Sequence, residues 1–156
     1  MTNPSVIRGL ICEFLRACPD VLALLSTGNP ADVVQEYVDE ANGDYFGSVA
    51  DLGTGRVLVA AHGWEPGGAQ MARYVQRFSI VLKPKGDPAL LASTIMNAKT
   101  SASGFDPDRS FVDSTIHPNY DPTVIPSFDR RTIRVDNNSN FDYWELNLAY
   151  ASRGRG

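Results

Sequence analysis

The stretch RYVQRFSIVLKPKGDPALLASTIMNA, residues 73–98, decides the fold. Apolar and polar side chains alternate over residues 73–83, and this period of two is typical of a half-buried strand. Gly86 then ends the strand, Asp87 is suited to cap a helix, and Pro88 suits the first turn of that helix. The positions that follow at helical spacing are Leu90, Leu91, Thr94, Ile95 and Ala98. The sequence therefore predicts a strand, a tight turn and a helix.

The predicted strand has two unlike faces. One face carries Tyr74, Gln76, Phe78, Ile80 and Leu82, and the other carries Arg73, Arg77, Ser79 and Lys83. We expect the first face to meet Leu91 and Ile95 in the core. The basic residues of the second face have two interpretations. They form either a solvated, edge-protecting surface or a salt-bridged contact with an acidic neighbour, such as a second copy of the chain or its own acidic loop.

Helix signals fill the N-terminal part of the chain. An apolar stripe over residues 4–18 follows Asn3, which is a suitable helix cap. A short second helical turn is expected over residues 21–25. Residues 30–41 fit a third helix, and their β-branched side chains leave a strand over residues 33–38 as the alternative.

The middle of the chain alternates between loops and strands. Residues 44–55 predict turns, residues 56–61 predict a central strand buried on both faces, and residues 63–68 predict a loop. Residues 99–130 are rich in proline and predict a long loop or arm that contains one strand, over residues 111–116. This loop is acidic, and its aspartates are Asp106, Asp108, Asp113, Asp121 and Asp129.

The C-terminal part of the chain predicts a hairpin with strands over residues 131–135 and 142–151. The inward side chains of its second strand are expected to be Trp144, Leu146, Leu148 and Tyr150, and the outward ones Tyr143, Glu145 and Asn147. The order of elements indicates the α+β class, with a mostly antiparallel sheet covered on one side by an N-terminal and a central helix. We expect residues 1–156 to form one domain.

Composition restricts the class of function. The chain has 156 residues, 43% of them hydrophobic, and a net charge of −4, which is typical of a soluble globular protein and disfavours a general nucleic-acid binder. We expect neither a signal peptide nor a membrane span, and therefore synthesis in a cytoplasm. Cys12 and Cys18 are too far apart along one helix for a disulfide, so both are predicted to be buried structural thiols.

Motifs for phosphate, metal or nucleophilic chemistry are incomplete. Gly53-Thr54-Gly55 lacks the third glycine and the following helix of a dinucleotide-binding loop. His62 and His117 are the only histidines, whereas a zinc site needs three or four ligands. We therefore predict no catalytic residue, metal or cofactor. An enzyme that pairs one of these histidines with an aspartate is one alternative, and a small binding module that uses the 99–130 loop is another.

Protein contacts are the function that the remaining surface residues favour. Trp64 lies in the predicted Gly/Pro loop, and Tyr120 and Phe128 lie in the acidic loop. Exposed aromatic side chains often anchor interfaces, although each could instead cover its own core. The candidate interface residues are Trp64, Arg73, Arg77, Lys83, Tyr120, Phe128, Arg130, Arg131 and Arg134.

Four segments taken in order resemble the tail-terminator proteins of long-tailed bacteriophages and the related neck and tail-completion proteins. The first is ACPDVLALLSTGN, at the end of the N-terminal helix, and the second is the strand RFSIVLKPKGD. The third is the short helix PALLASTIMNA, and the last is the closing strand FDYWELNLAYASRG. The resemblance covers most of the chain as an order of elements and includes no diagnostic residue.

The resemblance implies a structural virion protein without enzymatic activity. It implies a homohexameric ring at the head-proximal end of the tail, assembled in the host cytoplasm, which stops growth of the tail tube and joins the tail to the neck. Its partners would be further copies of itself, the tail-tube protein and a neck or connector protein. Genomic DNA would pass through the channel without sequence recognition, and no membrane is involved. Another head–tail connector or a tail-tube component is the alternative within this class.

Overall fold

The structure, a computed structural model, describes residues 3–39, 43–66, 74–99, 108–112, 120–124, 127–134 and 140–152. Its helices and strands run in the order α1 (Pro4–Arg16), α2 (Pro19–Ala23), α3 (Pro30–Val33), β1 (Val34–Glu36), α5 (Tyr45–Asp51), β2 (Arg56–Pro66), β3 (Tyr74–Lys83), α6 (Pro88–Asn97), β4 (Tyr120–Val124), β5 (Ser127–Arg134) and β6 (Asn140–Ser152). The fold belongs to the α+β class, as the sequence predicts.

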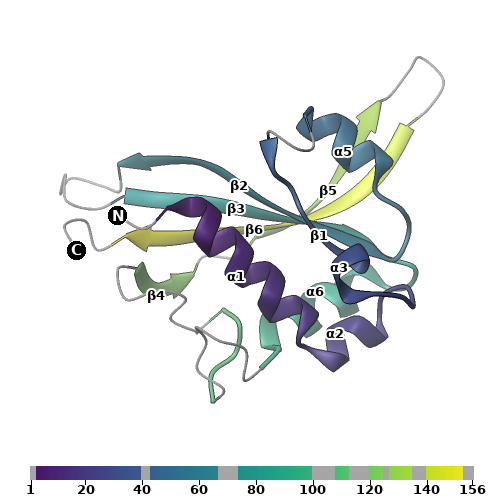
Figure 1. Cartoon of the computed structure of the whole chain (residues 1–156), viewed down its shortest axis with the longest axis horizontal. Helices are drawn as coiled ribbons and strands as arrows, with labels where there is room; N and C mark the ends of the chain where they lie inside the picture. Colours follow the sequence, from purple (N-terminus) through teal and green to yellow (C-terminus); the bar gives the residue numbers. More distant parts are fainter. Residues whose placement is uncertain are drawn as a thin grey trace.

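One mixed sheet organises the molecule, with strand order β1-β2-β3-β6-β4 (Figure 1). β1 pairs with β2 in parallel, and the other pairs are antiparallel. β5 also pairs with β6: its register runs from Ser127 opposite Asn147 to Arg134 opposite Asn140, whereas β4 meets β6 at Tyr150 and Ser152. The predicted C-terminal hairpin is therefore confirmed, and β4 and β5 follow each other along β6.

The main core lies between one face of the sheet and the helices α1, α2 and α6. Phe78, Ile80 and Leu82 of β3 belong to the same buried cluster as Leu91 and Ile95 of α6, which confirms the predicted contact. Complete burial of each such side chain contributes roughly 1.5–3 kcal/mol to folding. Most of the apolar driving force of the fold is therefore on this face.

Capping side chains fix where the two main helices begin. Asn3 accepts a hydrogen bond from the backbone N–H of Ser5 at 2.9 Å, and Asp87 accepts one from Ala89 at 3.0 Å. Each cap satisfies an N–H group that has no partner inside the helix. The turn between β3 and α6 thus follows from Asp87 and Pro88, as predicted.

The second face of the sheet is also covered, which the sequence did not predict. α5 occupies part of residues 44–55, where only turns were expected, and Asp44 caps it through Phe46 and Gly47. A second cluster joins α5 to this face through Tyr37, Val49, Leu52, Leu58, Ala60, Val81 and Tyr143. The outward assignment of Tyr143 and Glu145 is therefore wrong, because they are 4% and 8% exposed beneath this layer.

Four element predictions need correction. The expected helix over residues 30–41 ends at Val33, and β1 follows within the alternative strand range of residues 33–38, because β1 completes a parallel ladder with β2. β2 continues to Pro66 through the expected loop. Residues 108–112 form turns rather than the start of a strand. The 99–130 segment contains β4 and the first half of β5, and Pro122 is tolerated because β4 lies at the edge of the sheet.

Other predictions agree with the structure where it describes them. Cys12 and Cys18 are free and buried, and burial raises their pKa values to about 12 and about 11. Among the described helices, none is long and apolar enough to cross a membrane. The rest of the strand predicted over residues 111–116 lies outside the described residues, and so does His117.

Candidate functional site

The structure separates the nine candidate interface residues. Side chains are described for five of them: Arg77, Lys83, Phe128, Arg130 and Arg131. Trp64, Tyr120 and Arg134 lie on β2, β4 and β5, but their side chains are outside the described part of the chain, as is the whole of Arg73. The five placed side chains fall on three sites, which are the two faces of the β5–β6 hairpin and a pocket beside α5.

The first hairpin face combines aromatic and charged side chains. Phe128 and Trp144 stack with ring centroids 5.0 Å apart, and the Arg130 guanidinium carbon lies 6.0 Å from the Trp144 ring. Asp142 accepts hydrogen bonds from Thr132 at 2.7 Å and from Arg130 at 2.5 Å, and these two bonds lower the pKa of Asp142. Phe128 is thus partly used to cover Trp144, whereas Arg130 stays mostly exposed.

A row of polar side chains crosses the second sheet face from β5 to β2. Arg131 binds the Glu145 carboxylate at 2.6 Å, and Glu145 accepts a hydrogen bond from the Ser79 hydroxyl at 2.7 Å. The His62 ring nitrogen Nε2 lies 2.7 Å from the same hydroxyl oxygen, and Asn147 lies 3.0 Å from it. We call Arg131, Glu145, Ser79 and His62 the polar row. It ties together β5, β6, β3 and β2.

The polar row contains a serine, a histidine and a carboxylate, but not in the arrangement of a catalytic triad. In a triad the carboxylate orients the histidine, and the serine is open to substrate. Here Glu145 binds the serine directly, and Ser79 is 0% exposed. Burial lowers the pKa of His62, so the neutral ring is favoured. The arrangement satisfies buried polar groups rather than activating a nucleophile.

A cavity of about 370 Å³ opens beside the polar row. Its walls include Arg77, Asp129, Arg131, Glu145 and Asn147. The two arginines and two carboxylates balance in formal charge, and Asp129 lies 3.7 Å from Arg131. Arg77 is exposed here, as the sequence predicts, and it lies near Arg131 although the two come from different strands.

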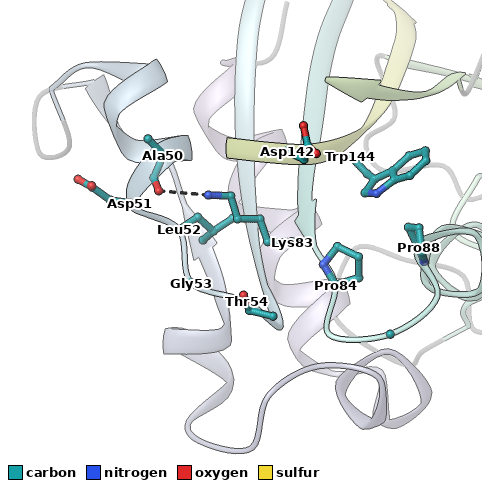
Figure 2. A pocket seen from close by; sticks show the side chains of 11 residues that line it. Ala50, Asp51, Leu52, Gly53, Thr54, Lys83, Pro84, Pro88, Asp142 and Trp144 are labelled. Carbon is teal, nitrogen blue, oxygen red and sulfur yellow. Dashed lines mark hydrogen bonds between the residues drawn. The ribbon is translucent and has the colours of Figure 1, made fainter. Parts of the chain in front are cut away.

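Lys83 does not share the exposed surface of Arg77, which corrects the expectation of a common basic face. It is 8% exposed, and its ammonium donates a hydrogen bond to the Ala50 carbonyl at 3.1 Å, at the C-terminal end of α5 (Figure 2). Burial lowers the pKa of Lys83. A cation at this end of a helix offsets the partial negative charge of its terminal carbonyls.

Lys83 borders an open pocket of about 590 Å³ between the α5–β2 turn, the β3–α6 turn and the start of β6 (Figure 2). Pro84, Pro88 and Trp144 line its far side. The Asp51 carboxylate points away from the Lys83 ammonium in this view. The pocket thus offers an indole, prolines, one tethered ammonium and the acidic residues Asp51 and Asp142. The described residues contain no cluster of three metal-ligating side chains.

The members of the polar row that sequence reasoning did not single out are Ser79 and Glu145. Both were assigned to outward-facing strand positions, and their period-two placement was right. The sequence contains no clear signal for the second layer on that face. α5, which forms this layer, has only one fully buried helical residue, Val49, and therefore no apolar stripe. No protein-family model and no curated protein sequence matches this chain.

Proposed function

We propose that this protein is a structural virion protein that forms a homohexameric ring at the head-proximal end of a phage tail. The ring would stop growth of the tail tube and join the tail to the neck, with DNA passing through its channel. The order of elements in the sequence suggests this role. The observation that supports it best is the outer edge of β5, with which no described strand pairs, because a ring needs a contact surface that the isolated chain leaves uncovered.

The β5 edge has the properties of such a surface. In the described part of the chain, β5 pairs with β6 and with no other strand. Ser127 and residues 129–132 are exposed along it. Arg130 and Arg131 are each held in place by a cross-strand carboxylate. Side chains that are already ordered lose less conformational entropy when a partner binds, so this edge is prepared for a contact.

Chemistry within the sites also favours contact over catalysis. The serine of the polar row is fully buried, and its histidine and carboxylate are used in holding strands together. A head-to-tail contact between different surfaces of identical chains closes into a ring when the rotation between neighbours permits it. The ring proposal therefore requires the β5 edge to meet a different surface of the next copy.

The first experiment is native mass spectrometry of the purified chain over a range of concentrations, alone and with tail tubes. A discrete six-chain assembly, formed alone or on contact with tubes, is the expected result. Arg131→Glu should weaken this assembly, and Lys85→Ala, in the exposed β3–α6 turn, is the matched control that should not. A chain that stays monomeric in the presence of tubes would contradict the proposal.

A further inference from the structure

α5 is attached to the rest of the fold by few side chains. Within α5 only Val49 is buried, and the C-terminal cap residue Leu52 is buried as well. Phe46 is 59% exposed. Tyr45 meets the sheet edge-on, through Tyr37 at 5.3 Å between ring centroids and through His62 at 5.4 Å. Burial of two aliphatic side chains is a small part of the stabilisation provided by the main core.

Glycines flank this short helix. Gly43 has a φ of +67°, and its backbone is anchored: its carbonyl accepts a hydrogen bond from the Tyr37 hydroxyl, and its N–H donates to the Asp39 carbonyl at 3.0 Å. On the other side, Gly55 is fixed: its N–H donates to the Lys83 carbonyl, and a Cβ there would lie 2.1 Å from the Ser26 hydroxyl oxygen. Gly53 lies between α5 and this fixed point. A movement of α5 can therefore pivot next to the anchored Gly43, be absorbed at Gly53, and stop at Gly55.

Two polar groups are buried when α5 lies on the sheet. The Lys83 ammonium is held under the end of the helix with 8% of the residue exposed, and burial lowers its pKa. The Tyr45 hydroxyl is also buried, and this burial raises the pKa of Tyr45. Moving α5 away from the sheet would break the hydrogen bond from Lys83 to the Ala50 carbonyl, but it would return both groups to water, which partly offsets the lost contacts at Val49 and Leu52.

We infer that α5 is a hinged cover, which opens as a unit between Gly43 and Gly55 while the sheet and the main core stay folded. Opening would uncover the sheet face formed by Val81 and Tyr143, together with the His62 end of the polar row. The inference concerns the folded chain itself and does not rest on the proposed ring, so either can fail without the other.

Thiol labelling can test this cover, because the chain has internal reporters of its main core. Val49→Cys places a thiol beneath α5, and Ala92→Cys is the matched control beneath α6, where Ala92 is 2% exposed. The natural Cys12 and Cys18 report opening of the main core in both variants. Under native conditions the thiol of V49C should react at least about 10-fold faster than that of A92C or Cys12, since a tenfold ratio corresponds to about 1.4 kcal/mol of opening free energy.

A second substitution separates local from global opening. Ile95→Ala creates a cavity in the main core without touching α5, so it should speed labelling of Cys12 by about 10-fold or more and leave the V49C rate unchanged. Ile95→Val serves the same purpose if I95A does not fold. If I95A speeds labelling of V49C and Cys12 by the same factor, α5 opens only with the whole domain and the inference is overturned.

Discussion

The two edges of the sheet are built in opposite ways. At one edge lies β1, three residues long and closed by side chains of α1. At the other lies β5, eight residues long and paired only with β6 in the described part of the chain. Because an open edge invites pairing with another chain, proteins usually protect it or use it. The contrast indicates that this protein protects β1 and leaves β5 available.

Arginine side chains carry the protection of β1. Arg16 donates two hydrogen bonds to the Val34 carbonyl, at 2.9 and 2.7 Å. Arg8 binds the Glu36 carboxylate at 2.8 Å, with its own side chain 11% exposed. These groups occupy the outer side of β1, where a neighbouring strand would otherwise pair. The Val34 carbonyl is therefore already occupied and not open to strand pairing with a second copy of the chain.

The arginine side chains of β5 form ion pairs with the neighbouring strand β6 instead of covering the outer edge of β5. Arg130 and Arg131 bind Asp142 and Glu145 of β6 on opposite faces of the hairpin. They leave the outer backbone of β5 uncovered within the described residues. Such charges discourage unspecific strand pairing yet permit a contact that supplies matching groups. This is the physical basis for placing the proposed subunit contact at β5.

The largest effect is expected from a substitution in the main core, because the strands at both edges of the sheet depend on this core for folding. Leu91→Asp puts a carboxylate at a position with 1% exposure in α6. A buried charge without a partner costs several kcal/mol, which is comparable to the total stability of a domain of this size. We expect L91D to lack a cooperative unfolding transition by circular dichroism. The adjacent Leu90→Asp is the matched control, since Leu90 is 50% exposed, and it should fold normally.

The next prediction compares the edges directly. Arg16→Ala leaves the Val34 carbonyl without its charged donor, and a hydrogen bond of this kind is worth about 1.5–3 kcal/mol. Urea unfolding should show a loss of this size for R16A. Arg130→Ala removes an ion pair whose side chains are 60% and 50% exposed, so its unfolding midpoint should stay nearly unchanged. Equal losses in the two variants would show that the β1 edge is not specially protected.

Much of this architecture could be predicted from the sequence where local signals agree with tertiary packing. α1 and α6 follow from capping residues Asn3 and Asp87 and from apolar positions at helical spacing. β6 follows from strict alternation over Trp144, Leu146 and Leu148. In each element the local preference and the buried face coincide, so one periodic pattern carries both.

The remaining elements depend on contacts that no local pattern contains. For β1 the sequence left a helix and a strand open, and the parallel ladder with β2 decides in favour of the strand. α5 contains Gly47 and no apolar stripe, so its one fully buried residue, Val49, gives too weak a signal. Alternation correctly put Ser79 and Glu145 on one face, but it could not say that this face is covered.

Assembly should be more sensitive than stability to changes at β5. Arg131 is half exposed and its partner Glu145 is 11% exposed, so Arg131→Ala should cost about 1 kcal/mol or less. Arg131→Glu adds repulsion with Asp129 and Glu145 and should reduce ring formation in native mass spectrometry while the chain still folds. Arg56→Glu, on β2 and away from β5, serves as a charge-reversal control. Equal assembly by R131E and the wild type would remove β5 from the proposed contact.

The smallest expected effect concerns the polar row, which joins the β5 side of the sheet to β2. Burial lowers the pKa of His62 below its ordinary value of 6.5. The unfolded chain therefore binds a proton at this histidine more readily than the folded chain just below pH 6.5, and His62 reduces stability as the pH falls through that window. Glu145 nearby opposes this shift, so the effect should be modest.

The difference in urea midpoint between wild type and His62→Gln, measured at pH 7.5 and pH 5.5, isolates this contribution from the carboxylates. We expect the wild type to lose more stability than H62Q between these pH values. An identical loss would mean that protonation of His62 is accommodated within the polar row, with Glu145 supplying full compensation for its burial.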